Sequence, residues 1–150
     1  SVTTIGEDAF YGCDNLASVN LGEGVHTIGY SAFEYCDALT SITIPASVTS
    51  IDNYAFYNCS NIVMEGTTPP AIAYSTFNSD ATILVPCTAV ETYQAAEYWQ
   101  NLNIQGNNYT VALSSTEGGL AQVTYSDCVA NIVTIEACGG WLCIYPMERW

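Results

Sequence analysis

The stretch LASVNLGEGVHTIGYSAFEYC (residues 16–36) is followed by LTSITIPASVTSIDNYAFYNC (residues 39–59), and the two are copies of one pattern. The apolar positions recur after 23 residues: Leu16, Val19, Leu21, Val25, Ile28, Ala32, Phe33 and Cys36 correspond to Leu39, Ile42, Ile44, Val48, Ile51, Ala55, Phe56 and Cys59. A fixed period of this length with an L-x-x-L-x-L core is typical of a solenoid, in which each repeat contributes a strand and a return segment and contacts only its neighbours.

Within each copy, the alternation of apolar and polar residues over 16–21 and 39–44 predicts a half-buried strand. The polar positions of these strands, Ser18, Asn20, Ser41 and Thr43, should face outward. The pairs Val25/Ile28 and Val48/Ile51 predict short return strands. The Ala-Phe pairs predict a tight turn of helix or 3-10 helix.

The pattern L-x-x-I-x-I-P-x-S-V-T-x-I-x-x-x-A-F-x-x-C resembles the BspA-like leucine-rich repeats. These repeats occur in surface proteins of anaerobic mouth and gut bacteria and in some parasitic protists. The likeness is close over residues 1–61 and weaker to about residue 105. It implies a mostly-β leucine-rich-repeat solenoid of 23-residue repeats, and an extracellular or cell-surface location.

From Ile62 the pattern weakens, because the positions equivalent to Ile42 and Ile44 are Glu65 and Thr67 and a Pro69-Pro70 pair follows. We expect the solenoid to close here, with TILVP (82–86) as its last strand. Thr88 with Glu91 three residues later is a capping-box signature, which predicts a helix through about residue 102. These segments resemble the carboxyl-terminal cap of bacterial members of the family, so residues 1–105 are interpreted as repeats plus cap.

Residues 106–150 form a second expected domain. Gly106-Asn107-Asn108 precedes the short alternating segments YTVALSS, GLAQVTY and NIVTIEA, which predict a small antiparallel β module. The run Y-T-V-x-x-S-S-x-x-G-G with a later V-T-I-E-A is similar to divergent internalin-type B-repeat modules. The three cysteines of this segment and its apolar ending WLCIYP depart from that pattern.

Composition limits the class of partner. The 15 acidic residues against one basic residue, Arg149, give a formal net charge of −14. Nucleic acids and anionic membranes are bound through Lys and Arg, so neither is an expected partner. No run of 18 apolar residues predicts membrane insertion. Ser1 opens in the middle of a repeat, so any targeting segment is expected to lie outside this sequence.

Three of the seven cysteines, Cys13, Cys36 and Cys59, occupy one column of the repeat. Equivalent side chains on stacked strands lie roughly 4.7–4.9 Å apart, whereas a disulfide needs Cβ atoms about 3.5–4.5 Å apart. We therefore expect a ladder of buried, reduced thiols.

Catalytic chemistry has little basis in the sequence. His26 is the single histidine, and its column is filled by threonine in the other copies, which indicates a surface position. The carboxylates are scattered over turns, and neither a phosphate-binding glycine motif nor a Cys-x-x-Cys pair is present. The expectation is a protein that is not an enzyme and uses no cofactor or metal.

The leading hypothesis is a secreted or surface-displayed recognition or adhesion module that binds protein or other cell-surface ligands. A structural spacer or self-associating segment is one alternative, because the amino-terminal repeat lacks its first strand. A carbohydrate-binding accessory module of a larger protein is another.

Two surfaces compete for the ligand: the tyrosine-bearing turns and the outward sheet positions. The turns carry Tyr11, Tyr30, Glu34, Tyr35, Tyr54 and Tyr57, and the sheet carries Ser18, Asn20, Ser41 and Thr43. Tyrosine buries more area and is enriched at binding hot spots, so the turns are favoured.

Overall fold

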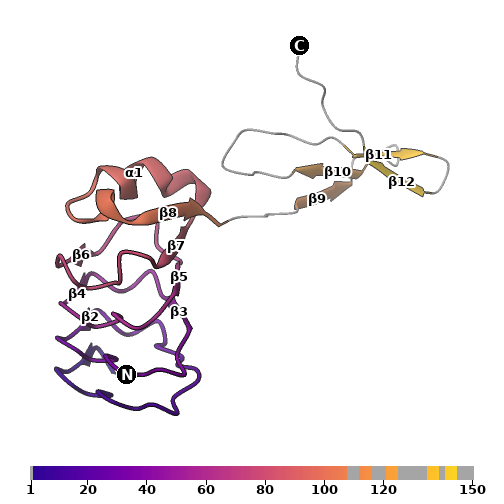
Figure 1. Ribbon diagram of the computed structural model, residues 1–150. Helices are drawn as coiled ribbons and strands as arrows, with labels where there is room; N and C mark the ends of the chain where they lie inside the picture. Colours follow the sequence, from indigo (N-terminus) through magenta and orange to yellow (C-terminus); the bar gives the residue numbers. More distant parts are fainter. Residues whose placement is uncertain (1, 108–111, 116–120, 125–134, 139–140, 145–150) are drawn as a thin grey trace. The chain divides into compact units, whose positions relative to one another are not determined.

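The computed structural model describes residues 2–107, 112–115, 121–124, 135–138 and 141–144 (Figure 1). Contacts between residues divide the chain into two units, Ser1–Gly106 and Asn107–Trp150. In the first unit the chain winds in successive coils, and strands of one coil pair with strands of the next in two parallel four-stranded sheets. This unit is a mostly-β repeat fold.

The first sheet, which we call the narrow sheet, consists of two-residue strands. Its order is β1 (Thr4–Ile5), β2 (Thr27–Ile28), β4 (Ser50–Ile51) and β6 (Ala71–Ile72). The parallel register places isoleucine opposite isoleucine in every pair. Ile28 and Ile51 are fully buried, because alternate residues of a strand point to opposite faces. The predicted return strands are confirmed.

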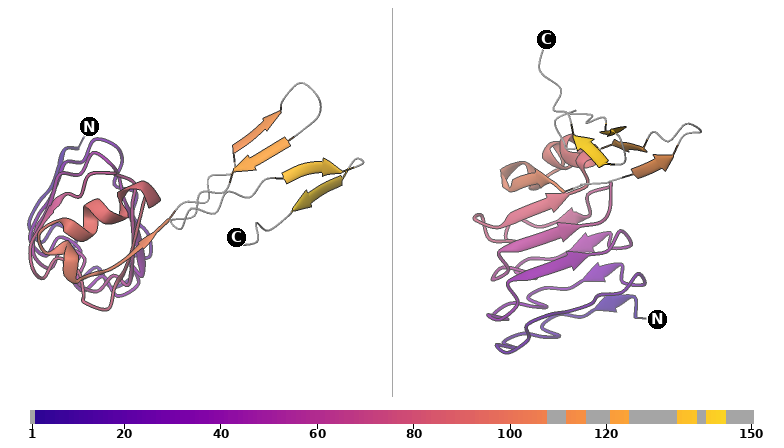
Figure 2. Two further views of the ribbon diagram at one scale, coloured as in Figure 1. Left: turned by 90° about the horizontal axis from the view of Figure 1, so that it is seen from above. Right: turned by 90° about the vertical axis from the view of Figure 1, so that its right-hand side faces the viewer.

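The second sheet, the wide sheet, consists of four-residue strands that Figure 2 shows stacked one above the other. Its order is β3 (Ser41–Ile44), β5 (Asn61–Met64), β7 (Thr82–Val85) and β8 (Asn103–Gly106). The parallel register aligns Ile42, Ile62, Ile83 and Ile104 in one inward row. The first three of these side chains are at most 3% exposed, so the wide sheet forms one wall of the core.

The prediction that the stack closes at Ile62 is wrong. It equates Ile42 with Glu65, whereas the wide sheet pairs Ile42 with Ile62, 20 residues later. The segment from the phenylalanine turn to the wide sheet is shorter in this coil: it runs over 56–62, where the preceding coil uses 33–42. The apolar pattern therefore continues with a changed spacing.

The predictions that Pro69-Pro70 ends the stack and that residues 82–86 form its last strand are also wrong. Strand β6 begins directly after Pro70 and pairs with β4, so the prolines do not stop the narrow sheet. Residues 82–85 form β7 as predicted, but β7 is not the last strand, because β8 pairs with it on its other side.

Residues 16–21 do not form the strand that their alternation predicts. They lie beside β3, and Val19 and Leu21 line a pocket of about 400 Å³ together with Thr43. The Asn20 Oδ1 accepts a hydrogen bond from the Gly22 amide at 3.0 Å. Gly22 has a φ of 67°, in the left-handed region. Both features turn the chain away from an extended ladder.

Between the two sheets, the rings of Phe10, Phe33, Phe56 and Phe77 stack in a row. Successive ring centroids are 5.0, 5.2 and 6.1 Å apart, and the planes are within 11° of parallel. The residues around each ring form turns and not the predicted turn of helix or 3-10 helix. Ser31 and Tyr35 have φ angles of 49° and 57°, which interrupt a right-handed helix.

The cysteine column is confirmed in part. Cys13, Cys36 and Cys59 are all free thiols, and Cys36 and Cys59 are buried as predicted. The prediction of burial is wrong for Cys13, which is exposed. In the described part of the chain, no coil packs on the amino-terminal side of the first turn, so its column position remains open to solvent.

The carboxyl end of the stack is covered by a short cap made of η1 (Cys87–Ala89), α1 (Val90–Ala95) and η2 (Trp99–Asn101). Tyr93 and Trp99 are buried against the last coil, and their rings meet edge to face at 4.8 Å. The Trp99 Nε1 donates to the Pro70 carbonyl at 2.9 Å, and the Tyr93 hydroxyl donates to the Gly66 carbonyl at 2.9 Å. The indole N–H of Trp99 and the hydroxyl of Tyr93 are thus both hydrogen-bonded to backbone carbonyls.

The helix predicted from Thr88 to about residue 102 is shorter than expected. The N-cap of α1 is Ala89, and no side chain caps it, so the capping box does not form. The helix ends at Ala95 because Ala96 is extended and Tyr98 has a φ of 66°. In place of one helix, the chain forms the three short segments η1, α1 and η2, and the left-handed Tyr98 lies between the last two.

The second unit contains two antiparallel hairpins in its described residues. Strand β9 (Ala112–Ser115) pairs with β10 (Ala121–Thr124), and β11 (Ile135–Cys138) pairs with β12 (Trp141–Ile144). The three predicted strands overlap β9, β10 and β11, although parts of those segments lie outside the described residues. Strand β12 falls in the apolar ending, for which no strand was predicted.

Candidate functional site

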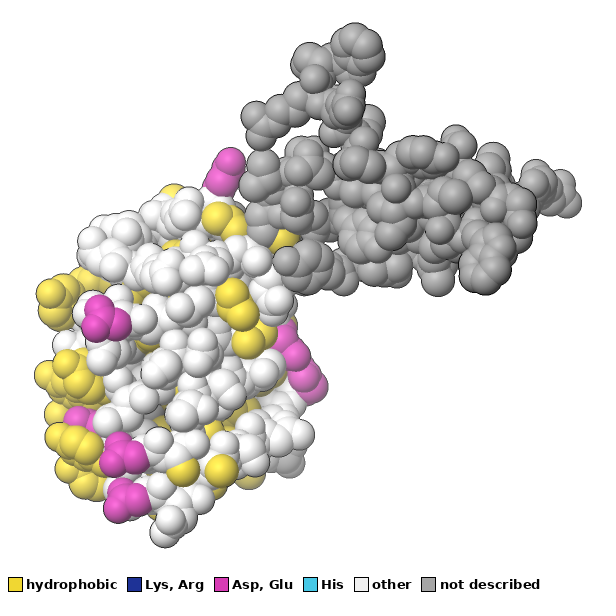
Figure 3. All heavy atoms as spheres, turned by 45° about the vertical axis from the view of Figure 1, so that its right-hand side comes forward, with side chains coloured by type: hydrophobic (Ala, Val, Ile, Leu, Met, Phe, Trp, Pro, Cys, Tyr) yellow, Lys and Arg dark blue, Asp and Glu magenta, His cyan; other side chains and the backbone are white. Residues whose placement is uncertain are grey.

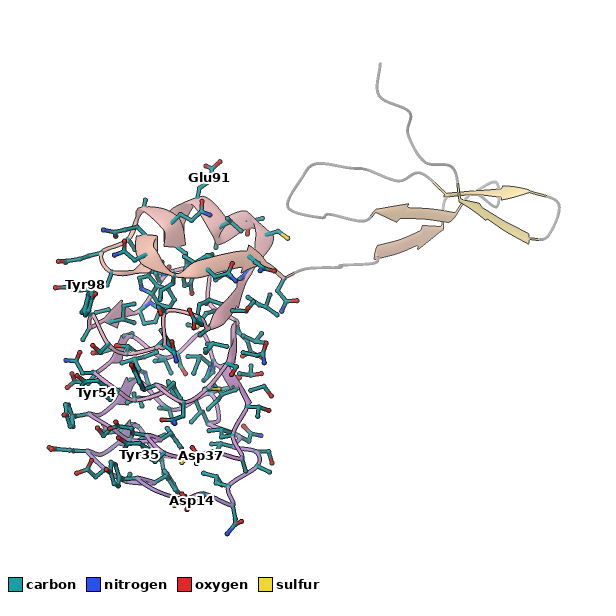
Figure 4. All side chains as sticks on the ribbon, in the orientation of Figure 1. Asp14, Tyr35, Asp37, Tyr54, Glu91 and Tyr98 are labelled. Carbon is teal, nitrogen blue, oxygen red and sulfur yellow. The ribbon has the colours of Figure 1, made fainter. Side chains whose placement is uncertain are left out.

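Exposed and half-buried tyrosines gather at the turns that flank the phenylalanine row and at the cap. We call this set the tyrosine edge: Tyr11, Tyr30, Tyr35, Tyr54, Tyr57, Tyr74 and Tyr98. Figure 4 shows Tyr35, Tyr54 and Tyr98 on one side of the stack. Tyr11 and Tyr57 directly follow Phe10 and Phe56 of the phenylalanine row, and both tyrosines are exposed. The repeat thus places aromatic side chains on successive coils at one edge.

The rings of neighbouring coils contact one another. Tyr11 meets Tyr35 edge to face at 5.4 Å, and Tyr30 meets Tyr54 at 5.7 Å. Tyr54 in turn meets Tyr57 at 5.6 Å. Four of these five rings are 41–51% exposed, and Tyr54 is half-buried between its neighbours. The rings therefore support each other while keeping a large area open to a partner.

Backbone hydrogen bonds between coils hold these turns in place. The Ser31 amide donates to the Asn53 carbonyl at 3.0 Å, and the Tyr54 amide donates to the Ser75 carbonyl at 2.9 Å. The Tyr35 amide donates to the Asn58 Oδ1 at 3.1 Å. Tyr35 and Tyr54 have φ angles of 57° and 59°. Such angles cost energy for a bulky residue, so the surrounding contacts fix the direction of both side chains.

Acidic side chains lie beside the tyrosines, and Figure 3 shows them next to a column of hydrophobic side chains at one edge. Glu34 is held by the Ser31 hydroxyl, which donates to its Oε2 at 2.5 Å. Desolvation raises the pKa of Tyr11, and so does the negative charge of Glu34 and Asp8. The edge therefore presents aromatic rings in a negative potential.

The alternative surface is the outward face of the wide sheet. Ser18, Asn20, Ser41 and Thr43 are exposed, as predicted. The outward rows of the later strands are likewise uncharged: Asn61, Val63, Thr82, Leu84, Asn103 and Gln105. Several of these polar groups bond to each other, as Asn103 Nδ2 does to the Thr82 Oγ1 at 3.4 Å. This face offers small groups that are partly satisfied already.

Tyr74 and Tyr98 were missed by sequence reasoning. They line a groove of about 210 Å³ together with Tyr57. Tyr74 stands three residues before Phe77, as Tyr30 stands three before Phe33, so the repeat carried a signal for it. Tyr98 had no such signal, because it belongs to the cap.

The residues that the structure describes hold no group of three or more His, Cys, Asp and Glu side chains suited to a metal ion. They also hold no helix with the length and apolar character needed to cross a bilayer. His26 is exposed, and its Nδ1 lies 2.6 Å from the Gly24 carbonyl oxygen.

Comparison with known families assigns the repeats. Residues 1–80 match the family described as "BspA type Leucine rich repeat region (6 copies)". No curated protein sequence matches the chain. The match covers more than half of the 150 residues and coincides with the coils that carry the phenylalanine row. The chain therefore belongs to the BspA-type leucine-rich repeat family.

Proposed function

We propose that this chain is a non-enzymatic recognition module, secreted or displayed at a cell surface, that binds a protein partner through the tyrosine edge. In this proposal residues 1–105 are a short leucine-rich-repeat solenoid with a capping helix, and residues 106–150 are a separate β module. The observation that carries the proposal is the contact of exposed tyrosine rings across successive coils. Repeat proteins use extended surfaces of this kind for binding.

The tyrosine edge is the stronger of the two candidate surfaces because of what a partner would bury there. A tyrosine buries a large apolar ring and retains a hydroxyl that can orient the partner. Ser41 and Thr43 on the sheet face bury little area. Interfaces are enriched in tyrosine, and most of their binding energy comes from a few such residues.

The charge of the edge narrows the class of partner. Glu34 and Asp8 lie beside Tyr11, and the whole chain has one basic residue. A basic or neutral protein surface therefore complements the edge, whereas a nucleic acid or an anionic membrane would be repelled. A lysine or arginine of the partner can also stack on the exposed tyrosine rings.

Self-association is a second candidate, based on the amino-terminal coil. Val2 is 66% exposed and Phe10 is 40% exposed, and β1 is an edge strand of the narrow sheet. An unpaired strand edge with apolar side chains favours pairing with another chain. Sedimentation at increasing protein concentration tests this candidate, and a constant monomer mass would reject it.

An array of extracellular-matrix and cell-surface proteins identifies the partner. Tyr11→Ala and Tyr57→Ala should each weaken binding to that partner by about 1 kcal/mol or more. The matched controls are Ser41→Ala and Thr43→Ala, which alter the sheet face and should leave affinity unchanged. If the sheet variants weaken binding and the tyrosine variants do not, with circular dichroism unchanged, the site lies on the sheet.

A further inference from the structure

A groove lies at the junction between the last coil and the cap. It has a volume of about 210 Å³ and is lined by Tyr57, Tyr74, Tyr98, Ser75, Ser79, Asn101, Phe77 and Leu102. Tyr57 and Tyr74 come from turns of the repeat, and Tyr98 comes from the cap. The rings of Tyr74 and Tyr98 meet edge to face, with centroids 6.5 Å apart.

The chemistry of the lining is uncharged. In a chain of net charge −14, none of the lining side chains is acidic or basic. Six of the eight carry a hydroxyl or an amide, and the other two are Phe77 and Leu102. Aromatic faces with neutral donors and acceptors fit a ligand that has apolar C–H faces and several hydroxyl groups.

Hydrogen-bonding groups in the groove are available to a ligand. Within the described residues, the side chains of Ser75 and Asn101 have no hydrogen-bond partner. Within the same residues, the hydroxyl of Tyr74 also has no hydrogen-bond partner, and Tyr74 is 79% exposed. Groups that are free in this way can each donate to or accept from a bound hydroxyl without breaking an internal bond.

The backbone at Tyr98 is in the left-handed region, with a φ of 66°. Glycine adopts this angle without cost, and a tyrosine does not. The angle sets the direction in which the Tyr98 ring leaves the cap and meets Tyr74. Strained residues of this kind concentrate at ligand sites.

We infer that this groove binds one or two rings of a neutral saccharide. Its volume is below the roughly 300–1,000 Å³ of sites for drug-sized molecules, which fits a short ligand. A proline-rich peptide is the competing occupant, because such peptides also bind aromatic-lined grooves. The density of hydroxyl and amide groups favours the saccharide. The groove shares Tyr57, Tyr74 and Tyr98 with the tyrosine edge, but Tyr11 does not line it, so substitution of Tyr11 distinguishes the two proposals.

Isothermal titration calorimetry tests the inference with maltohexaose, cellohexaose, mannohexaose, chitohexaose and a decaproline peptide. At least one oligosaccharide should bind, and Tyr74→Ala should weaken its affinity by about tenfold or more, because one ring face is lost. Tyr98→Gly should have the same effect, and it removes the ring at a position where glycine accepts the positive φ. The matched control Tyr11→Ala should bind the oligosaccharide as the wild type does.

Three results would overturn the inference: binding of none of the four oligosaccharides, binding of decaproline in their place, or unchanged affinity of Tyr74→Ala. Tyr74 is largely exposed, so Tyr74→Ala decides the question even if Tyr98→Gly fails to fold. Tyr11→Ala separates this outcome from the proposed function, since it should affect only the protein partner.

Discussion

Cys13, Cys36 and Cys59 occupy one column of the repeat, yet the structure places them in two environments. Burial raises the pKa of Cys36, and it raises the pKa of Cys59 to about 11. Cys13 has the same sequence context but lies on the first coil, where it is exposed. The position of a cysteine in the stack therefore determines the exposure of its thiol more than the local sequence does.

Alkylation with iodoacetamide at pH 8, resolved by peptide mass spectrometry, tests this difference. Cys13 should react in the native protein, whereas Cys36 and Cys59 should react only after denaturation, because the thiolate is the reactive form and is scarce in a buried site. Equal native rates for Cys13 and Cys36 would contradict the assigned stacking.

At the scale of elements, the row of phenylalanine rings joins successive coils between the two sheets. Phe33 is 1% exposed and stacks on rings above and below, while Phe10 is 40% exposed and stacks on one side only. Phe33→Ala should lower the free energy of unfolding by about 3–5 kcal/mol, because it leaves a cavity inside the stack. Phe10→Ala is the matched control and should cost less. Urea denaturation measures both, and equal losses would show that the row does not pack as described.

A hydrogen bond from the Tyr93 hydroxyl to the Gly66 carbonyl holds the cap against the last coil. Tyr93→Phe keeps the ring and removes the bond, so it should lower the free energy of unfolding by about 0.5–1.5 kcal/mol at pH 7. Urea denaturation of both proteins measures this loss.

The same variant has a predicted pH dependence. Burial raises the pKa of Tyr93 from 10.0 to about 12. The wild type therefore has the full contribution of this group below pH 10 and loses it as the pH rises toward 12. Because phenylalanine does not titrate, the difference in stability between wild type and variant should shrink over that window. A difference that stays constant or grows would contradict the buried position of the hydroxyl.

The elements also show what the sequence could and could not predict. Ile28 and Ile51 were placed in return strands because their 23-residue spacing is regular. Strand β5 was missed because the spacing from Ile42 to Ile62 is 20 residues, and a fixed period cannot detect a shortened turn. The helix was extended too far because the left-handed conformation of Tyr98 follows from the packing of the cap and has no signal in composition.

For the whole molecule, repetition explains how side chains of one kind come to line up along one edge of the stack. Each coil places a phenylalanine inward and polar or aromatic residues outward, so features on one coil recur on the next. The tyrosine turns could be named from the sequence, but the contacts between Tyr11 and Tyr35 and between Tyr30 and Tyr54 depend on the stacking of coils. We propose that this tyrosine edge is the recognition surface.

Hydroxyl-radical footprinting tests that claim most directly, with and without the partner found on the protein array. Tyr11, Tyr30 and Tyr35 report on the edge, whereas Val63 and Leu84 report on the outward face of the wide sheet. The proposed site predicts that bound partner lowers the oxidation of the three tyrosines and leaves that of Val63 and Leu84 unchanged. Protection of Val63 and Leu84, with the tyrosines oxidised as in the free protein, would contradict it.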